Sequence, residues 1–487
     1  MFRLTAQHSR QLDRFSENLC VNSEELLQNA GRGVARELMR VAKASEGPVV
    51  FFIGKGNNGG DGKVAADILL KRKYKIVLIP VEADLKKYSP QIEGAGWLVD
   101  ALLGVGLKGE TQGWVREAIA VMNRSQKRIL SIDIPSGLSA DKGIPLGAAV
   151  KATMTVCLGG VKLGCFVHPG VEYAGKIVAA DIGIPKEAWQ KISFHAQSTE
   201  PEHFKSFLKK RPLGSHKGDF GHLLVVAGSK AMPGAGFLAS QAALRAGAGL
   251  VTYALPEGAY QKFDPKHAEV MVQAVPDNGA GYFVPESAAA VLKNCEKKRA
   301  VVLGPGLGRN PETIAFVQSV AAKIDLPLVL DADGLFCVSN SPRLLNNRKA
   351  PTLLTPHLGE MAQLLGWQTG EVDRAKIQAS LDAAREWNAI VILKGYRSLI
   401  ALPQGNLFVN PTGNPGMATA GMGDVLSGVL GGLLAQGLPP DKAALAGVYL
   451  HGLAGDRVAE EEGQTGLIAS DVARMLPKAI RRVEQSA

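Results

Sequence analysis

The chain contains 487 residues, of which 46% are hydrophobic, 21% charged and 6% aromatic. This length exceeds one ordinary core of roughly 100 to 200 residues, so it favours two or three domains and excludes a single small binding module. The composition also excludes a disordered chain. The net charge of +10 is spread along the sequence without a basic and aromatic strip or a zinc-finger spacing, so it does not predict nucleic-acid binding. A polyanionic small ligand fits this charge equally well.

Cysteine usage and the N-terminal sequence indicate the compartment. The five cysteines are odd in number and form no Cys-x-x-Cys pair, which argues against a disulfide framework and a zinc site. The first residues lack an apolar signal core, and no apolar run reaches the length of a bilayer span. We therefore expect a cytoplasmic protein without membrane contact. The 56 glycines cluster in short stretches, which indicates loops where the backbone approaches a ligand closely.

Helix and strand patterns alternate through the first half of the chain. Asn22 is placed to cap a helix in which Leu26, Ala30, Val34 and Leu38 share one face. Short apolar runs that end in glycine or polar residues indicate buried parallel strands. In chain order we expect strand 49–53, helix 60–71, strands 76–81 and 98–103, helix 114–122, and strands 129–134, 152–158 and 176–182. The alternation predicts a doubly wound α/β domain.

The second half restarts this pattern after a polar, lysine-rich stretch at residues 188–217. We place the domain junction there and assign residues 1–205 and 206–487 to two domains. The halves share a fold class but no residue-level repeat, so they are interpreted as two fused α/β domains. The expected elements are strand 222–226, helix 236–246, strands 251–254 and 300–303, helix 312–322, strands 328–330, 352–355 and 390–393, and helix 424–435.

The first glycine cluster, residues 54–62, follows the first strand. It contains a formal G-x-G-x-x-G, and Glu82 lies at the end of the next strand, so dinucleotide binding is one interpretation. A P-loop is excluded because Lys63 is followed by Val64 rather than Ser or Thr. The amide and carboxylate oxygens in this turn also suit a hard cation or a hydroxylated substrate.

Polar residues recur at the carboxyl ends of the expected strands. In a parallel sheet these ends face one crevice, so the side chains of Asn58, Asp61, Asp100, Asp133 and Ser136 are expected to converge. The alternative for each alone is a helix cap or a turn. The glycine-containing loop at 104–110 offers backbone N–H groups to an anion.

Four stretches of the first half, 57–62, 99–106, 132–137 and 181–185, resemble the NAD(P)H-hydrate epimerase family in the same order. The resemblance implies a Rossmann-like domain that interconverts the epimers of the hydrated nicotinamide ring, with K⁺ on Asn58, Asp100 and Ser136. Asp133 and Lys162 are candidates for the acid and base, although Lys162 has the alternative of lying on the surface. The sequence departs from the family at Gln28, where Glu is commoner. The implied substrate-binding residues are Asn57, Asn58, Gly59, Gly60, Asp61, Gly104, Val105, Gly106, Leu107, Lys108, Gly109, Glu110 and Asp133.

The strongest motif of the second half is the glycine-containing stretch 414–428. Its glycines free backbone N–H groups at the start of an apolar helix, an arrangement that binds phosphate or stabilises charge during phosphate transfer. Asp424 follows directly and is interpreted equally as the N-cap of that helix or as a general base. Glycine turns, carboxylates, His357 and Lys394 at the ends of other strands favour a nucleotide site over random turns.

This half resembles the ADP- or ATP-dependent NAD(P)H-hydrate dehydratase family, which has a ribokinase-like fold. The matching stretches are 216–218, 221–223, 227–229, 304–308, 331–334, 355–360, 394–395 and 414–424. The resemblance places Gly308, His357 and Asp424 against the hydrated nicotinamide, with Asp424 as the catalytic base and Mg²⁺ accompanying the nucleotide. At residues 420–422 the family more often has Gly-Gly-Thr, so a possible phosphate-binding hydroxyl is absent. The implied nucleotide-binding residues are Lys394, Gly395, Tyr396, Arg397, Ser398, Asn414, Pro415, Gly416, Met417, Ala418, Thr419, Ala420, Gly421, Met422 and Gly423.

Together the two resemblances predict a bifunctional repair enzyme, with hydrated NADH or NADPH and an adenine nucleotide as partners, no nucleic acid, and a homo-oligomeric state. One alternative is a ribokinase-type small-molecule kinase with an accessory first domain. Another is that the first domain is a non-catalytic nucleotide sensor.

Overall fold

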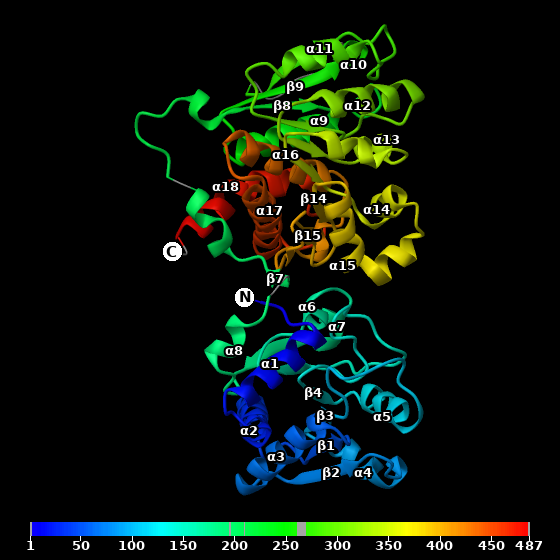
Figure 1. The fold of residues 1–487 in the computed structure, drawn as a ribbon, viewed down its shortest axis with the longest axis vertical. Coiled ribbons are helices and arrows are strands. Elements are labelled where there is room, and N and C mark those ends of the chain that lie inside the picture. The colour runs from blue at the N-terminus through cyan, green and yellow to red at the C-terminus, as the bar shows by residue number, and fades with distance from the viewer. Residues whose placement is uncertain (1, 194–195, 209, 261–268, 486–487) are drawn as a thin grey trace. The chain divides into compact units, whose positions relative to one another are not determined.

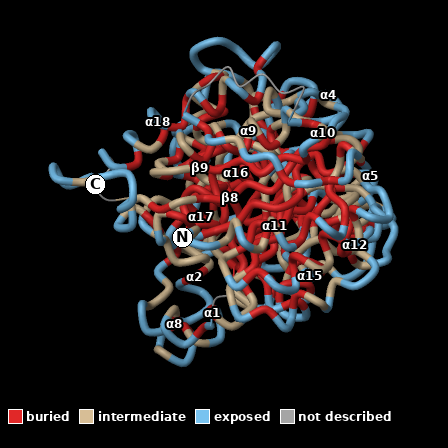
Figure 2. Tube along the Cα trace, turned by 90° about the horizontal axis from the view of Figure 1, so that it is seen from above, coloured by how far each residue is buried: buried red, intermediate tan, exposed pale blue. Residues whose placement is uncertain are grey.

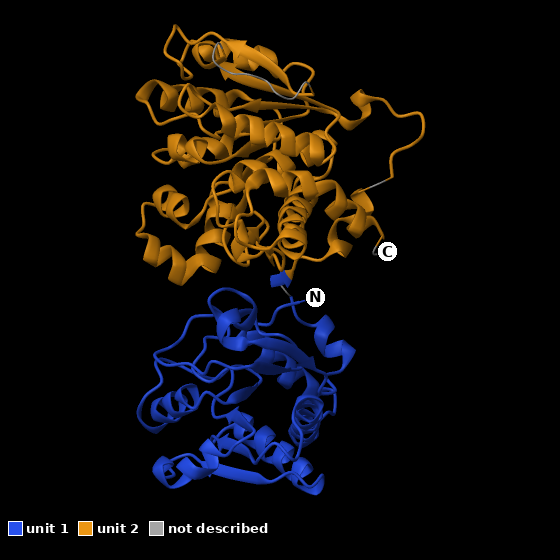
Figure 3. Ribbon diagram, turned by 180° about the vertical axis from the view of Figure 1, so that it is seen from behind, with its two compact units in different colours: residues 1–197 blue, residues 198–487 orange. Residues whose placement is uncertain are grey.

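The computed structural model describes residues 2–193, 196–208, 210–260 and 269–485 (Figure 1). The chain divides into two compact units, residues 1–197 and 198–487 (Figure 3). The domain boundary after residue 205 stays a sequence-based prediction.

The first unit is built on a six-stranded parallel sheet with the order β2-β1-β3-β4-β5-β6. The chain runs outward from β1 to β2 and then returns to β3 on the other side of β1. This reversal opens a crevice beyond the carboxyl ends of β1 and β3, the usual ligand position in open α/β sheets. The strands are β1 (Val49–Ile53), β2 (Ile76–Pro80), β3 (Trp97–Ala101), β4 (Arg128–Ile132), β5 (Met154–Leu158) and β6 (Lys176–Ala180).

Helices cover both faces of this sheet, which confirms the predicted doubly wound fold. Residues of α2 and α3 pack with Phe51 in one apolar cluster, and residues of α4 and α5 pack with its neighbour Phe52 in another. The helices are α1 (Ala6–Asn18), α2 (Ser23–Val41), α3 (Asn57–Lys71), α4 (Ser89–Glu93), α5 (Gly113–Arg124), α6 (Leu163–Phe166), α7 (Gly170–Ala174) and α8 (Lys186–Gln190).

Two helix starts test the sequence analysis. Asn22 caps α2 as predicted, because its side chain accepts a hydrogen bond from the Glu25 N–H at 2.8 Å. The prediction that α3 begins near Gly60 is wrong, because the helix begins at Asn57. Asn and Gly have low helix propensity, so their helical conformation here is set by packing against the sheet.

The other sheet has ten strands in the order β10-β9-β8-β11-β12-β13-β14-β15-β16-β7; β8–β16 belong to the second unit, and β7 spans the boundary at residue 197. Pairing is parallel from β10 to β14 and antiparallel from β14 through β16. The strands are β7 (Ala196–Ser198), β8 (His222–Val226), β9 (Leu250–Pro256), β10 (Met271–Val275), β11 (Ala300–Leu303), β12 (Leu328–Leu330), β13 (Thr352–Leu354), β14 (Ile390–Leu393), β15 (Leu399–Ala401) and β16 (Leu407–Val409).

Helix α16 is buried along most of its length (Figure 2). It packs closely on α9, where Gly428 leaves room for the backbone of Ala239. The helices are α9 (Pro233–Arg245), α10 (Glu257–Tyr260), α11 (Ser287–Asn294), α12 (Pro311–Lys323), α13 (Asp333–Val338), α14 (Leu358–Leu365), α15 (Thr369–Glu386), α16 (Met422–Ala435), α17 (Pro440–Glu462) and α18 (Ala469–Gln485). None of the helices in the described residues combines the length and apolar character needed to cross a membrane.

Candidate active sites

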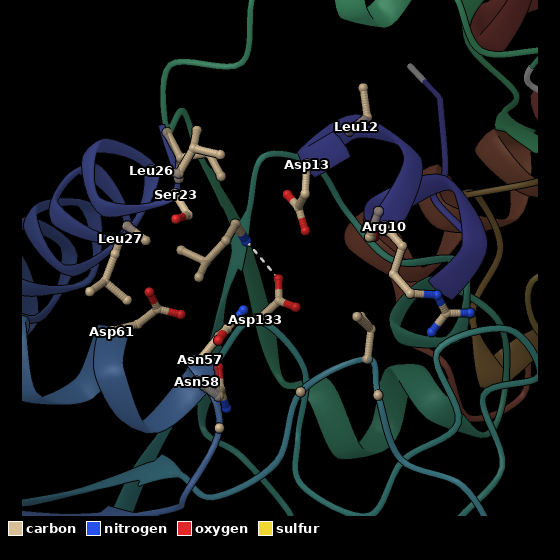
Figure 4. A pocket seen from close by; sticks show the side chains of 18 of the residues that line it. Arg10, Leu12, Asp13, Ser23, Leu26, Leu27, Asn57, Asn58, Asp61 and Asp133 are labelled. Carbon is tan, nitrogen blue, oxygen red and sulfur yellow. Dashed lines mark hydrogen bonds between the residues drawn. The ribbon is translucent and has the colours of Figure 1, made fainter. Parts of the chain in front are cut away.

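A pocket of about 780 Å³ lies in the first unit, beyond the carboxyl ends of β1, β3 and β4 (Figure 4). Two glycines allow the backbone to fold tightly around it. A side chain on Gly54 would collide with the backbone of Leu102, and one on Gly59 would collide with the backbone of Gly54. The first turn of α3 therefore lies close against the strand ends, and its polar side chains reach the pocket.

Most of the residues that the sequence predicts for this site line the pocket. Gly59, Gly60, Gly109 and Glu110 do not, although the three glycines adjoin residues that do. The predicted residues among the lining are Asn57, Asn58, Asp61, Gly104, Val105, Gly106, Leu107, Lys108 and Asp133. Glu82, the candidate ribose ligand, pairs instead with Lys55 at 2.7 Å on the surface.

Asp133 and Lys162 form a buried ion pair at the base of the pocket. Lys162 Nζ donates to Asp133 Oδ1 and, at 2.7 Å, to the carbonyl oxygen of Leu158. The Leu158 N–H donates to the same carboxylate oxygen at 3.0 Å. Burial is the largest single effect and lowers the pKa of Lys162, but the facing Asp133 carboxylate, together with Cys157 and Cys165, raises that pKa by more in total, so Lys162 is held in its charged form.

The alternative that Lys162 lies on the surface is wrong, because its side chain is 2% exposed. The sequence only weakly indicates that this lysine is buried, because the indication is limited to its place after an apolar strand and two glycines. The sequence places Lys162 four residues after the end of β5, close to the carboxyl edge of the sheet.

Asn58, Asp100 and Ser136 meet around the backbone of Leu103. Asn58 Nδ2 donates to the Leu103 carbonyl oxygen at 2.9 Å, and the Leu103 N–H donates to Ser136 Oγ at 2.9 Å. Asp100 is fully buried within β3 and accepts hydrogen bonds from Ser131 Oγ and the Ser136 N–H, both at 2.8 Å. Burial raises the pKa of Asp100, and the hydrogen bonds from Ser136 and Ser131 offset only part of that rise.

Helix α1 brings residues to the pocket that the sequence analysis missed. Ser9, Arg10, Leu12, Asp13 and Glu17 all belong to the lining. The sequence does contain a pattern that predicts this helix. Leu12, Phe15 and Leu19 recur at helical spacing, and the preceding Thr5 is a residue type that caps helices, as it does here.

In the second unit, the glycine-containing loop leads directly into α16. Gly421, with a φ of +85°, caps the helix, and Asp424 lies in its first turn. The interpretation of Asp424 as the N-cap is therefore wrong. Its carboxyl group lies where burial and the nearby Asp331 carboxylate raise its pKa to about 7, against the opposing effect of Lys394.

Lys394, which is 21% exposed, forms an ion pair with the buried Asp331. Lys394 Nζ lies 2.8 Å from Asp331 Oδ1 and 3.6 Å from Glu360 Oε2. Thr355 Oγ1 and Ser427 Oγ also donate to Asp331, at 2.7 and 2.6 Å. Burial lowers the pKa of Lys394, but the two carboxylates raise it by more. One fixed positive charge thus lies beside the start of α16.

The two segments predicted to hold the nucleotide are neighbours. A side chain on Gly423 would lie 3.3 Å from Lys394 Nζ, and Arg397 Nη1 donates to the carbonyl oxygen of Pro411 at 3.1 Å. Asn414 is held by Asp456 of α17, because its Nδ2 donates to Asp456 Oδ1 at 2.9 Å. The sequence analysis missed Asp456, an isolated carboxylate next to glycines in a long helix.

The remaining predicted residues adjoin these groups. His357 caps α14, and its backbone N–H donates to Glu360, the carboxylate that faces Lys394. The Gly308 N–H donates to Asp333 Oδ2 at 2.9 Å. Asp333 also contributes to the raised pKa of Asp424, so both residues lie on the Asp424 side of the unit.

Comparison with known proteins gives the family. The profile of NAD(P)H-hydrate dehydratases matches residues 223–478, and that of the YjeF-related protein N-terminus matches residues 23–93 and 78–164. The bifunctional NAD(P)H-hydrate repair enzyme of Moorella thermoacetica is 37% identical over 100% of this chain and 98% of its own length. The chain belongs to the family of bifunctional NAD(P)H-hydrate repair enzymes. The enzyme of the same name from Thermofilum pendens is 35% identical over 97% of this chain and 95% of its own length.

Solved structures confirm the ribokinase-like fold of the second half. The ADP/ATP-dependent NAD(P)H-hydrate dehydratase of Bacillus subtilis, co-crystallised with ATP and Mg²⁺, matches with a TM-score of 0.52 and 30% identity. The match covers 60% of this chain and 100% of that chain. A ribokinase-like superfamily protein of Enterococcus faecalis shares the fold with a TM-score of 0.52 and 24% identity, over 61% of this chain and 99% of that chain.

The buried ion pair of the first unit makes a stability prediction. Asp133→Asn leaves the Lys162 ammonium buried without its anion, which is expected to lower the free energy of unfolding of this unit by about 3–5 kcal/mol. The double variant Asp133→Asn/Lys162→Met removes the stranded charge and is expected to recover most of that loss. Urea titration with hydrogen exchange of peptides from residues 49–162 measures this unit within the full chain.

The matched control is Glu46→Gln, which breaks a more exposed pair with Arg128. Its expected effect is much smaller, because solvent screens an exposed ion pair. An Asp133→Asn protein as stable as the control variant contradicts the prediction.

Proposed function

We propose that the first unit interconverts the R and S epimers of hydrated NADH or NADPH, and that the second unit dehydrates the S epimer at the expense of ADP or ATP. Family membership supports both activities. The observation that carries the proposal is that one chain holds an acid-lined pocket in one unit and, in the other, a glycine loop that leads into α16 with Asp424 in its first turn.

The chemistry of the first unit follows from the substrate. Water added across the 5,6 double bond leaves a hydroxyl on C6, which is bonded to ring N1. Loss of this hydroxyl as water leaves a cation shared between N1 and C6, and return of water to the other face gives the other epimer. The charged Asp133 carboxylate, fixed by Lys162 and Leu158, is placed to stabilise that cation, so we assign it a catalytic role.

The oxygen groups of Asn58, Asp100 and Ser136 fit a potassium ion. They are the hard donors that such a cation prefers, and the Leu103 carbonyl oxygen lies among them. Asp100 is a fully buried carboxylate whose interactions in the described residues are all hydrogen bonds, with no cationic side chain. A bound K⁺ would balance this charge and hold the turn between β3 and the 104–110 loop against α3.

The second unit is proposed to phosphorylate the C6 hydroxyl and then eliminate phosphate, which restores the double bond. Asp424 takes the hydroxyl proton, with Gly308 and His357 beside the substrate. Residues 394–398 and 414–423 bind the nucleotide, and Lys394 with the backbone N–H groups at the start of α16 offsets the charge on the transferred group.

Mg²⁺ would arrive with the nucleotide. Among the described residues, no group of three or more His, Cys, Asp or Glu side chains is arranged to hold a metal ion. Mg²⁺ usually binds to substrate phosphates with one or two carboxylates, and Glu360 beside Lys394 is placed to supply one. The ion would neutralise the phosphate oxygens. A cytoplasmic location and a homo-oligomeric state stay predictions.

The central test uses the full chain with mixed NADH hydrates, Mg²⁺ and ADP or ATP. Both epimers are expected to disappear, with recovery of reduced-nicotinamide absorbance and release of free phosphate. Disappearance of the S form alone means that the first unit does not epimerise and favours the sensor alternative. A stable phosphorylated product favours the kinase alternative, and loss of neither epimer contradicts the whole proposal.

Asp424→Asn tests the base. General-base catalysis contributes roughly 10²–10⁴-fold, so dehydration of the S epimer is expected to fall by at least about 100-fold while the nucleotide KM changes little. The base acts when deprotonated, and the pKa of Asp424 is raised to about 7. In the unaltered protein kcat/KM is therefore expected to rise with pH up to about 7 and then level off. A variant that keeps its rate removes Asp424 from this role.

Replacement of K⁺ by Li⁺ tests the potassium site. Because a bound ion stabilises the folded state, the first unit is expected to gain about 1.4 kcal/mol for each tenfold excess of K⁺ over its dissociation constant, and Li⁺ is expected to give a smaller gain. Asp100→Asn is expected to abolish the difference between the two salts. Denaturation of the full chain in KCl and in LiCl measures this effect without an activity assay, and equal stability in both salts contradicts the assignment.

A further inference from the structure

Two carboxyl groups enter the epimerase pocket from different helices. Asp13 extends from α1 and Asp61 from α3 near its start, and both side chains point into the pocket that Asp133 also lines (Figure 4). Asp61 is 7% exposed, whereas Asp13 is open to the pocket. Neither carboxyl group has a hydrogen-bond partner within the described part of the chain, so both are available to a ligand.

The Asp133 carboxyl group already accepts two hydrogen bonds within the protein. Its Oδ1 accepts from Lys162 Nζ and from the Leu158 N–H. These two donors take up the hydrogen-bonding capacity of that oxygen atom and fix the orientation of the carboxyl group. The Asp13 and Asp61 carboxyl groups carry no such restraint.

The surroundings of these two groups favour their protonated forms. Burial is the largest cause that raises the pKa of Asp61, to about 8, and the Asp133 and Asp13 carboxylates add to it. Burial also raises the pKa of Asp13, with contributions from Asp133 and Glu17. Lys162 opposes both shifts. Near neutral pH Asp61 thus offers a carboxylic acid, and the pKa of Asp13 is shifted in the same direction.

Inversion at C6 requires proton transfer on both faces of the ring. The oxygen leaves from one face and an oxygen returns to the other face. An acid on the first face and a base on the second face can therefore complete the inversion in one turnover. Residues on two separate helices meet this requirement, whereas a single group on one wall does not.

We propose that Asp13 is a second acid–base residue of the epimerase unit, which acts on the C6 hydroxyl from the α1 side while Asp61 acts from the α3 side. The assignment rests on the proposed epimerase function.

The steps balance as follows for one direction. The carboxylic acid on one side protonates the C6 hydroxyl, the C6–O bond breaks, and water leaves as the N1 lone pair forms an N1=C6 double bond. Water then attacks C6 from the opposite face, the electrons of that double bond return to N1, and the carboxylate on that side takes a proton from the attacking water. One water is lost and one is gained, and the proton has moved from one carboxyl group to the other.

The experiment follows a solvent oxygen label in the full chain. In water enriched in ¹⁸O, each inversion by the unaltered protein is expected to place one solvent oxygen on C6, after subtraction of the exchange without protein. Asp13→Asn and Asp61→Asn are each expected to slow inversion by at least about 100-fold. Each variant keeps one carboxyl group, so each is expected to exchange the label into one epimer with retention, and the two variants are expected to label opposite epimers.

The matched control is Asp67→Asn, which removes an exposed carboxylate from α3 outside the pocket lining. It is expected to invert at the rate of the unaltered protein. Hydrogen exchange of residues 49–162 checks that each variant folds. If Asp13→Asn does not fold, Asp13→Glu keeps a carboxyl group on α1 and is expected to retain label exchange into both epimers.

Several outcomes overturn the assignment. The first is inversion by the unaltered protein without uptake of ¹⁸O, and the second is inversion by Asp13→Asn at a rate within threefold of the control. The third is that both variants label the same epimer. The fourth is that a folded Asp13→Asn protein loses both label exchange and inversion. Label in only one epimer from a folded Asp13→Glu protein also overturns it. Failure of the unaltered protein to invert either epimer is a separate result, because it removes the epimerase function itself.

Discussion

Both units depend on the constraint that a parallel sheet covered on both faces leaves no room for polar side chains along its strands. In the second unit, alternate strand residues such as Val225 and Val302 join one apolar cluster, and their neighbours Leu224 and Val301 are equally buried on the other face. Polar groups therefore gather where the strands end, and the carboxyl ends face the helix starts. Asp100 is an exception in the first unit, since it lies inside β3 and accepts hydrogen bonds from Ser131 of β4 and from Ser136.

The same constraint explains why the two sites share an electrostatic plan without sharing a sequence. Each has a lysine that lies against a buried carboxylate, Lys162 with Asp133 and Lys394 with Asp331. Each also has a further acid near the start of a helix, Asp61 or Asp424, whose pKa burial and the paired carboxylate raise to about 8 or about 7. The carboxylate that faces the lysine thus favours the protonated form of the nearby acid. A proton donor and a fixed charge are thereby kept side by side near neutral pH.

The sequence was sufficient for the parts of the fold that local patterns determine. β1, β8, β11, β12 and β14 have the predicted bounds, because short apolar runs between glycines and polar residues have few alternatives. The long helices α17 and α18 were not predicted. α17 is rich in Ala and Gly and is buried around much of its circumference, so it lacks the one-sided apolar face that the periodicity test requires.

Site residues that directly follow a strand or lie in a clear motif were predictable from the sequence. Site residues that reach a pocket only through tertiary packing were missed. Asp133 and Asp424 follow clear motifs. Asp13 reaches the pocket only because α1 packs through Leu4 and Leu12 against α8, which no local pattern contains. The burial of Lys162 likewise depends on the backbone of Leu4, which pairs with the segment around it.

Met422 shows how a departure from the family pattern is accommodated. It occupies the first position of α16, is 7% exposed and belongs to the main apolar cluster of the second unit. Its side chain therefore strengthens the packing beneath the loop and offers no hydroxyl to a phosphate. Gly421 and Gly423 on either side add no side chain at this helix start, and Lys394 supplies the nearby positive charge. An anion at this position would thus be held by main-chain donors and one lysine, so the absent threonine removes one contact without removing the physical basis of the site.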